Sequence, residues 1–379
     1  MKRESALIML VFLLLLPTTI QAESPNFSVS AEGAILMEAE SSRILYAKKE
    51  HEKLRIASIT KIMTAILAIE SGKMNEMAKV SSKAERVEGS RIYLRVGDKM
   101  KLEDLVYGLM LKSGNDAAVA IAEHVAGSVE GFVYLMNEKA SQLGMTNTMF
   151  QNPHGLDDHE DHYSTAYDMA LLTQYAMKNE HYQKISATKS HSVEEGTRIV
   201  WKNKNRLLTE LYPYSTGGKT GFTKRARRTL VSTAMKEDMD LIVITLNAPN
   251  DWHDHMNLFN WAFDSHKLAR LVEEGKQEGI EDEFYKDHVF ASYSFEYPLT
   301  EKEQKIVKKE ITLYRSPGKE SRENFEPPNP VGKVELFLNE RMIGQVPLYY
   351  APLEKREKKG FWTRFADIFS FTIGVRSND

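Results

Sequence analysis

The chain has 379 residues, of which 42% are hydrophobic and 27% are charged, and its formal net charge at pH 7 is −3. This composition is typical of a folded globular protein, and the length favours two domains. The small net charge argues against nucleic acid as a partner. The absence of cysteine excludes disulfides, a thiol nucleophile and thiolate metal sites.

The first 22 residues have the layout of a secretory signal peptide. Lys2 and Arg3 precede an apolar run from Ala6 to Leu16, and Ala22 ends the short polar stretch that follows. The apolar run is shorter than the ~20 residues that span a membrane comfortably. We therefore expect cleavage after Ala22 and a mature protein that works outside the cytoplasmic membrane, with an uncleaved anchor as the alternative.

Residues 23–273 are predicted to form one domain that mixes helices and strands. We expect two strands around a turn within 33–48, a buried helix over 58–71, two or three helices between 102 and 143, and a helix over 165–177. Residues 152–163, rich in His and Asp, indicate a surface loop. Short β-type runs at 229–234 and 241–246 predict adjacent antiparallel strands, and a helix over 254–272 is expected to close the domain.

The composition changes after residue 273 to charged residues and then to short strand-like segments. These lie at 289–297, 311–314, 334–338 and 343–349, so we predict a small β-rich domain over 274–354. Residues 355–379 place aromatic and aliphatic side chains on one helical face with basic residues beside them. This pattern favours a helix that lies in a membrane interface, with a helix docked on the second domain as the alternative.

Ser58 and Lys61 stand three residues apart at the start of the predicted buried helix. One helical turn brings their side chains together, and a lysine whose pKa is lowered by burial is a suitable base for a serine nucleophile. The Ser-x-x-Lys pattern also occurs at Ser186 and Ser316, although only Ser58 begins an apolar helix. The pattern alone is therefore weak evidence of an active site.

Two further patterns follow Ser-x-x-Lys in a fixed order. Ser113-Gly114-Asn115 comes after a helical stretch, and Lys219-Thr220-Gly221 precedes a β-type run, as expected of an edge strand. The ordered trio Ser-x-x-Lys, Ser-x-Asn and Lys-Thr-Gly is the signature of penicillin-recognising enzymes. The segments around the trio, together with Phe150–Leu156, closely resemble the low-molecular-mass D-alanyl-D-alanine carboxypeptidases over about residues 30–350, most nearly the sporulation-associated members in Bacillus-type bacteria.

The resemblance implies an α/β (α+β) fold, with helices packed on both sides of an antiparallel sheet and the active site between the sheet edge and the helices. Ser58 is implied as the acylated nucleophile, Lys61 as its general base and Ser113 as the relay of a proton to the leaving D-alanine. The implied substrate-binding residues are Asn115, which orients the peptide, Lys219, which supports the electrostatic field, Thr220, which holds the terminal carboxylate, and Gly221 and Phe222. Backbone N–H groups of Ser58 and Phe222 are the implied oxyanion hole.

The chain departs from the family pattern at one point. Many members place an arginine some thirty residues beyond Lys-Thr-Gly to bind the substrate carboxylate, whereas this chain has Asn250–His255 there. Arg225, Arg227 and Arg228 are candidates to replace it, although solvated charges near a turn are the commoner role of such residues.

The implied activity is removal of the terminal D-alanine from peptidoglycan stem peptides through an acyl-enzyme, with β-lactams as covalent inhibitors. The implied place is the cell wall or the outer face of the cytoplasmic membrane, with the forespore envelope as a narrower option. A β-lactamase and a non-catalytic β-lactam or peptidoglycan sensor are the alternatives. We expect no cofactor and no metal, because His and Asp of residues 152–163 more often serve turns and solvent than zinc.

Overall fold

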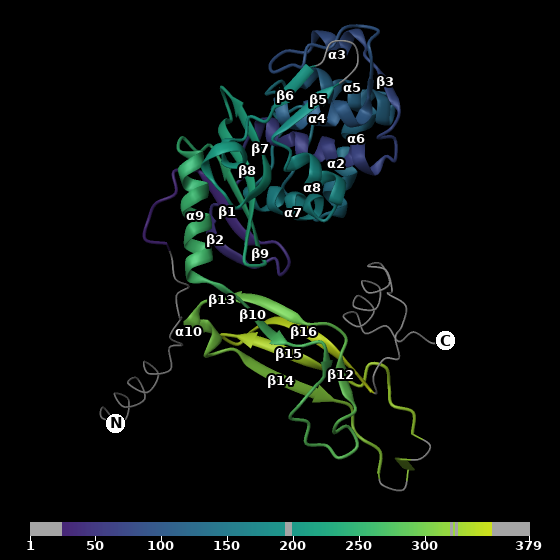
Figure 1. The fold of residues 1–379 in the computed structure, drawn as a ribbon, viewed down its shortest axis with the longest axis vertical. Helices are drawn as coiled ribbons and strands as arrows, with labels where there is room; N and C mark the ends of the chain where they lie inside the picture. The colour runs from purple at the N-terminus through teal and green to yellow at the C-terminus, as the bar shows by residue number, and fades with distance from the viewer. Residues whose placement is uncertain (1–24, 194–198, 319–320, 323–324, 351–379) are drawn as a thin grey trace, which may run out of the picture. The chain divides into compact units, whose positions relative to one another are not determined.

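The computed structural model describes residues 25–193, 199–318, 321–322 and 325–350. The chain divides into two compact units, Met1–Leu268 and Ala269–Asp379 (Figure 1). The predicted signal peptide and the predicted membrane-associating tail both lie outside the described residues.

The first unit contains a five-stranded antiparallel sheet with the strand order β2-β1-β9-β8-β7 (Figure 1). Its strands are β1 (Gly33–Glu38), β2 (Ile44–Lys48), β7 (Ser215–Thr223), β8 (Arg227–Lys236) and β9 (Met239–Leu246). The strand β7, which carries the Lys-Thr-Gly motif, lies at an edge of the sheet, as the sequence predicts.

Helices cover both faces of this sheet. One face packs against α9 (Asp251–Ser265). The other elements are α2 (Lys61–Glu70), α3 (Ser82–Arg86), α4 (Leu102–Lys112), α5 (Asn115–Ala126), α6 (Val129–Gln142), α7 (Ala166–Met177), α8 (Glu180–Ser186), the pairs β3 (Met77–Lys79) with β4 (Lys99–Lys101) and β5 (Ser190–Val193) with β6 (Ile199–Lys202), the single 3-10 turn η1 (Ala57–Thr60) and the short π-helix η2 (Leu207–Leu211). Within the described ranges no single helix has the length and apolar character to cross a membrane, and only α5 with α6, bent by 84°, meets that test as a pair.

Two separate apolar cores form because successive side chains of a strand point to opposite faces of the sheet. In β1, Ile35 and Met37 lie in the core shared with the helical lobe, whereas Leu36 lies in the core shared with α9. Phe259 of α9 is fully buried in this second core. The predicted arrangement of helices on both sides of an antiparallel sheet is confirmed.

The second unit is rich in β-structure. A five-stranded sheet has the order β11-β12-β16-β15-β14, and β10 pairs with β13. Its elements are β10 (Lys267–Val272), β11 (Gly275–Lys276), β12 (Val289–Ala291), β13 (Phe295–Leu299), α10 (Glu301–Gln304), β14 (Lys308–Leu313), β15 (Gly332–Leu338) and β16 (Arg341–Tyr350). Every second residue of β15 is buried, which is the pattern of a sheet with one face against a core.

The prediction that the helix over residues 254–272 ends at residue 272 is wrong. Helix α9 stops at Ser265, His266 is extended, and Lys267–Val272 forms β10. The segment continues as a strand because it pairs with β13, whose residues begin 23 positions after β10 ends. Such a distant partner leaves no mark on the local pattern of residues 266–272.

Candidate active site

The Ser-x-x-Lys motif lies where the turn η1 leads into α2. The residue before Ser58 is Ala57, whose φ of 49° is in the left-handed region that few non-glycine residues adopt. After this turn Ser58 is partly exposed, whereas Lys61, the first residue of α2, is fully buried. The two side chains meet, with 2.9 Å between Lys61 Nζ and Ser58 Oγ.

Lys61 Nζ has three oxygen neighbours. Besides Ser58 Oγ, Nζ lies 2.8 Å from Asn115 Oδ1 and 2.6 Å from the backbone oxygen of His154, and both of these atoms only accept hydrogen bonds. A neutral amine donates its two N–H groups to these oxygens, which leaves its lone pair free for the Ser58 hydroxyl. Burial lowers the pKa of Lys61 well below its usual value, and the charges of Lys219 and Lys204 lower it further, against an opposing effect of Asp116.

The second serine and the second lysine of the trio also lie in contact. Ser113 ends α4 with a left-handed φ of 63°, and Lys219 lies on β7. Lys219 Nζ donates to Ser113 Oγ at 3.1 Å and to the backbone oxygen of Thr220 at 2.8 Å. Burial, with a smaller effect from the Lys204 charge, lowers the pKa of Lys219 to about 7.

Asn115 joins Lys61 to the chain segment that precedes β4. Its side-chain oxygen accepts from Lys61, its Nδ2 donates to the backbone oxygen of Glu88 at 2.6 Å, and its side chain is buried. The next residue, Asp116, accepts hydrogen bonds from the backbone N–H groups of Ile92 and Leu94. The segment before β4 is thereby held against the start of α5, which fixes the orientation of the Asn115 amide.

Gly155 allows the loop at residues 152–163 to approach the nucleophile. Its φ is +84°, and a Cβ at this position would lie 1.9 Å from the backbone oxygen of Ala57. Asn152 Oδ1 accepts from the backbone N–H groups of His154 and Gly155, at 3.3 and 2.7 Å. This tight turn directs the His154 carbonyl at Lys61.

The two buried histidines of this loop have structural contacts that the sequence did not reveal. Gln151 N–H donates to Nδ1 of His162, so Nε2 carries the proton and donates to Thr60 Oγ1 at 2.9 Å. Thr60 in turn donates to the backbone oxygen of Ala57 at 2.8 Å. Burial lowers the pKa of both His154 and His162 to about 3, so both rings are neutral. In the described part of the chain, no group of three or more His, Cys, Asp or Glu side chains is arranged to hold a metal ion.

The edge strand β7 approaches Ser58 at a glycine. A Cβ on Gly221 would lie 3.0 Å from the backbone nitrogen of Ser58, so a side chain here would push the strand away. Its neighbours flank the nucleophile: Thr220 is partly exposed, and Phe222 is 62% exposed. The structure thus brings all eight residues of the predicted site into one region of the first unit.

Lys204 is a charged residue of the site that belongs to no sequence motif. It follows β6, and its Nζ lies 3.4 Å from Ser90 Oγ. The backbone oxygen of Ser90 accepts from the backbone N–H of Asn115 at 2.7 Å, which connects Lys204 to the Ser-x-Asn motif. Its positive charge lowers the pKa of both Lys61 and Lys219.

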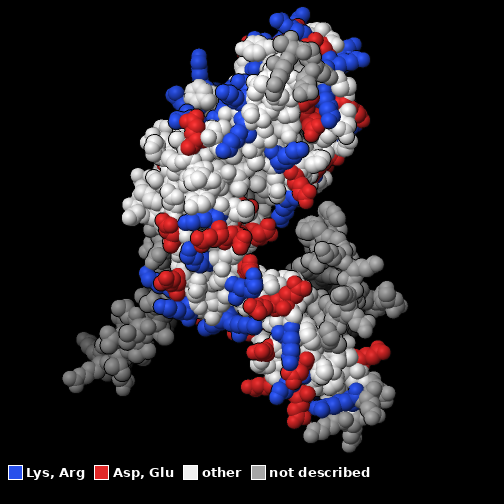
Figure 2. Space-filling model, viewed as in Figure 1, with Lys and Arg blue, Asp and Glu red and all other residues white. Residues whose placement is uncertain are grey.

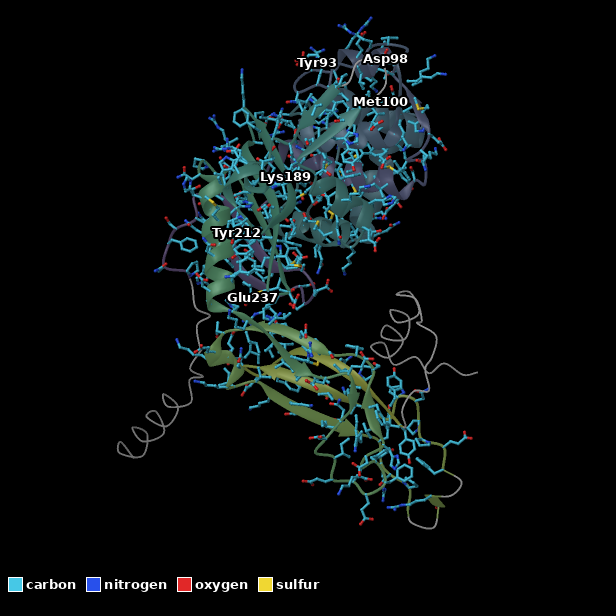
Figure 3. The ribbon with its side chains drawn as sticks, in the orientation of Figure 1. Tyr93, Asp98, Met100, Lys189, Tyr212 and Glu237 are labelled. Carbon is cyan, nitrogen blue, oxygen red and sulfur yellow. The ribbon has the colours of Figure 1, made fainter. Side chains whose placement is uncertain are left out.

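The other two Ser-x-x-Lys patterns form no comparable pair. Ser186 is buried and accepts from the backbone N–H of Gly218 at 2.9 Å, whereas Lys189, labelled in Figure 3, is an exposed residue. Ser316 belongs to the second unit and donates to Asp282 Oδ2 at 2.7 Å. Lys319, the lysine of the last pattern, lies outside the described residues.

Two of the three candidate arginines are bound by acidic side chains. Arg228 donates twice to Asp251 Oδ1, at 2.9 and 2.7 Å. Arg225 donates to both carboxylate oxygens of Glu160 at 2.7 Å each. Arg227 is exposed and has a φ of 60°.

Comparisons with known proteins agree with this geometry. A family model described as D-alanyl-D-alanine carboxypeptidase (Peptidase S11) matches residues 18–250, and the model of the penicillin-binding protein 5 C-terminal domain matches residues 267–355. The chain is 37% identical to D-alanyl-D-alanine carboxypeptidase DacF of Bacillus subtilis over 272 residues, covering 66% of this chain and 69% of that protein. It is 33% identical to DacC of Escherichia coli over 382 residues, covering 93% and 91%.

Solved structures extend the likeness to both units. Penicillin-binding protein 5 of Haemophilus influenzae matches with a TM-score of 0.71 and 27% identity, covering 87% of this chain and 98% of that one. Penicillin-binding protein 6B of Escherichia coli matches with a TM-score of 0.68 and 26% identity, covering 86% and 97%. With its ordered trio of motifs, this chain belongs to the Peptidase S11 family and is a serine-type D-alanyl-D-alanine carboxypeptidase that acts on peptidoglycan.

Proposed function

We propose that Ser58 and Lys61 carry the covalent chemistry of D-alanine release. The neutral amine of Lys61 accepts the proton of the Ser58 hydroxyl while Oγ attacks the carbonyl carbon of the penultimate D-alanine. The peptide C–N bond then breaks, an ester forms on Ser58, and D-alanine leaves with a proton relayed through Ser113. Water hydrolyses the ester and restores the hydroxyl. The contact between Lys61 Nζ and Ser58 Oγ, with two carbonyl oxygens around the same amine, is the observation that carries this proposal.

The remaining residues are assigned to binding. The backbone N–H groups of Ser58 and Phe222 would stabilise the oxyanion. Asn115 would orient the peptide amide, and Thr220 would hold the terminal carboxylate in the field of Lys219. The closeness of Gly221 to the Ser58 nitrogen supports this assignment, because it sets β7 beside the nucleophile.

Lys204 is our choice for the cation that replaces the missing arginine. Its Nζ lies 3.4 Å from Ser90 Oγ, and the backbone oxygen of Ser90 binds Asn115 of the Ser-x-Asn motif, so the charge of Lys204 lies at the edge of the site. Arg225 and Arg228 are weaker choices for the terminal carboxylate, since Arg228 is paired with the buried Asp251 and Arg225 follows Thr220 by five residues, beyond the end of β7.

The cellular setting is proposed from the sequence alone. Residues 1–22 would direct export, and residues 355–379 would attach the enzyme to the outer face of the cytoplasmic membrane. A role in sporulation, with action in the forespore envelope, is proposed from the resemblance to sporulation-associated carboxypeptidases; 37% identity to DacF of Bacillus subtilis is compatible with it.

The decisive test compares covalent labelling with product release. Purified mature protein is incubated with a fluorescent penicillin, and D-alanine release from a peptide that ends in D-Ala-D-Ala is measured in parallel. We expect Ser58→Ala to abolish both signals. Lys61→Arg should slow acylation about 10²- to 10⁴-fold, because a guanidinium stays protonated and cannot act as a base.

The exposed Lys189, which belongs to an unused Ser-x-x-Lys pattern, supplies the control. Lys189→Gln should label at the wild-type rate. Labelling without D-alanine release in the wild type would favour a sensor, and rapid turnover of penicillin would favour a β-lactamase. Label that survives in Ser58→Ala would disprove the assignment of the nucleophile.

A further inference from the structure

The proposed function fixes the direction in which a stem peptide crosses β7, and the inference below rests on it. If Thr220 holds the terminal carboxylate and Phe222 N–H holds the scissile carbonyl, the retained part of the peptide continues past Phe222. It then runs toward Thr223 and the turn between β7 and β8. Because β7 is an edge strand, an extended peptide can pair with it as an added strand.

The turn that the retained peptide would meet is strongly cationic. Lys224, Arg225 and Arg227 are exposed within four consecutive positions. Figure 2 shows Lys and Arg side chains gathered at this end of the β7–β8 hairpin. Among the residues that the structure describes, Arg225 forms an ion pair, whereas Lys224 and Arg227 form none. The turn therefore favours an acidic group on the substrate.

A carboxylate of the protein itself already occupies this cationic position. Glu160 accepts two hydrogen bonds from Arg225, at 2.7 Å each, and one from Arg55 Nη2 at 2.6 Å. Arg55 precedes Ser58 by three residues, and Arg225 follows Phe222 by three residues, so Glu160 joins the segment that carries the nucleophile to the turn after β7. The hydrogen bonds from Arg225, with the positive charges of Arg225 and Arg55, hold the pKa of Glu160 below its usual value, so it is ionised at neutral pH.

The exposure of these side chains indicates which of them can move. The side chain of Glu160 is 76% exposed and that of Arg225 is 48% exposed, whereas that of Arg55 is only 16% exposed. Arg55 is also anchored to the backbone oxygen of His159 at 3.1 Å. An ion pair as exposed as Glu160 with Arg225 is weak, because water screens the two charges. A second carboxylate can therefore take the place of Glu160 at little cost.

Stem peptides carry a carboxylate at a suitable distance. Arg225 lies in the turn just after β7, three residues beyond Phe222, so the two backbones are at most about 10 Å apart along the chain. In a stem of the type L-Ala-γ-D-Glu-diamino acid-D-Ala-D-Ala, the γ-linkage leaves the α-carboxylate of D-glutamate free. This group lies two residues before the D-alanine that acylates the serine, about 7 Å along an extended chain, within reach of a long arginine side chain.

We propose that Arg225, with Arg55 beside it, recognises the free α-carboxylate of the stem D-glutamate, and that Glu160 occupies this position until the substrate replaces it. Arg225 is then a specificity-determining residue that distinguishes carboxylate stems from stems in which this group is an amide. Glu160 acts as an internal competitor of the substrate.

The test uses two synthetic pentapeptides that differ in one group. L-Ala-γ-D-Glu-L-Lys-D-Ala-D-Ala carries the free carboxylate, and the same peptide with D-isoglutamine carries an amide. D-alanine release gives kcat/KM for each peptide, and the ratio of the two values is the readout. A general structural defect lowers both values and leaves the ratio unchanged.

We expect Arg225→Gln in the full-length mature protein to lower the ratio about threefold, the size expected for one exposed ion pair. Glu160→Gln should raise the ratio by a similar factor, because it removes the competitor. Both differences should shrink at 0.5 M salt, where exposed charges are screened. The control is Lys83→Gln, which removes a comparably exposed pair with Glu130 and should leave the ratio at the wild-type value.

A ratio that stays at the wild-type value in both Arg225→Gln and Glu160→Gln would overturn the inference while leaving the proposed function intact. A ratio that falls in Glu160→Gln would equally overturn it, since Glu160 would then assist binding. Failure of the wild-type enzyme to release D-alanine from either peptide would contradict the proposed function itself.

Discussion

At the scale of single residues, the site depends on two lysines removed from water. Lys61 and Lys219 are both buried, and each is close to a serine hydroxyl. Removing an ammonium group from water favours its neutral form, and a nearby positive charge has the same effect. For Lys61 this charge comes from Lys219 and then from Lys204, and for Lys219 it comes from Lys204, so Lys204 at the edge of the site affects two proton affinities.

This arrangement predicts the pH dependence of acylation. The rate should rise with pH as Lys61 loses its proton, at a pH well below the usual lysine range, because only the neutral amine accepts the proton of Ser58. The rate should fall as Lys219 loses its charge, near pH 7. The profile of the acylation rate constant for a penicillin, measured from pH 4 to 10, should therefore be bell-shaped.

Replacing Lys204 by Gln tests the cause of these shifts. Removal of a positive charge stabilises the protonated forms of both lysines, so both limbs of the profile should move to higher pH. Lys202→Gln removes an exposed lysine two residues away and is the matched control. A profile that does not move in Lys204→Gln would mean that the charge of Lys204 does not lower the two pKa values.

At the scale of elements, three short backbone segments place the catalytic groups. The turn η1 exposes Ser58, the loop at residues 152–163 delivers the His154 carbonyl to Lys61, and the edge strand β7 approaches at Gly221. The loop and the turn are connected through the hydrogen bonds of His162, Thr60 and Ala57. A change in the loop is therefore transmitted to the backbone beside the nucleophile.

Gly155→Ala is the sharpest probe of this connection. The new Cβ would lie 1.9 Å from the backbone oxygen of Ala57, so the loop must move and carry the His154 carbonyl away from Lys61. We expect penicillin acylation to fall more than about tenfold, as for loss of a precisely placed catalytic group, and the melting temperature to fall as well.

Gly144→Ala is the matched control for Gly155→Ala. Gly144 also has a positive φ, of 73°, but nothing lies within 4 Å of the added Cβ. This variant should lose about 1–2 kcal/mol of stability from the left-handed backbone alone and keep its acylation rate. Equal acylation rates in the two variants would show that contact with Ala57 does not position the catalytic groups.

The elements also show where prediction from sequence stopped. The buried helix after Ser58 and the edge strand at Lys-Thr-Gly were predictable, because apolar runs and motif order are local properties. The burial of His154 and His162 inside an apparently polar loop was not, because it depends on packing against η1. The strand β10 was missed for the same reason, since its partner is distant in the chain.

At the scale of the whole molecule, every residue of the predicted site belongs to the first unit. Ser58, Asn115 and Lys219 come from three separate parts of that unit. Their side-chain hydrogen bonds join residues of the same unit. The second unit has its own apolar core, built from residues such as Val289 and Leu336.

A fragment of residues 25–268 should therefore retain the acylation chemistry. We expect its penicillin acylation rate to stay within about twofold of the full-length value, because a unit with its own core can fold alone. Circular dichroism of the fragment provides the control for folding. A folded fragment that labels more than tenfold slower would show that residues 269–379 support the site.

The sequence by itself determined the chemistry of this protein, because the order and spacing of Ser58, Lys61, Ser113, Asn115 and Lys219 are properties of the chain. It also determined the helix and strand types wherever the apolar period was strong. Only the tertiary structure decided the proton affinities of the charged side chains. Proton affinities depend on burial and on neighbours from distant segments, and no local pattern marks Lys204 at the edge of the site or Glu160 between two arginines.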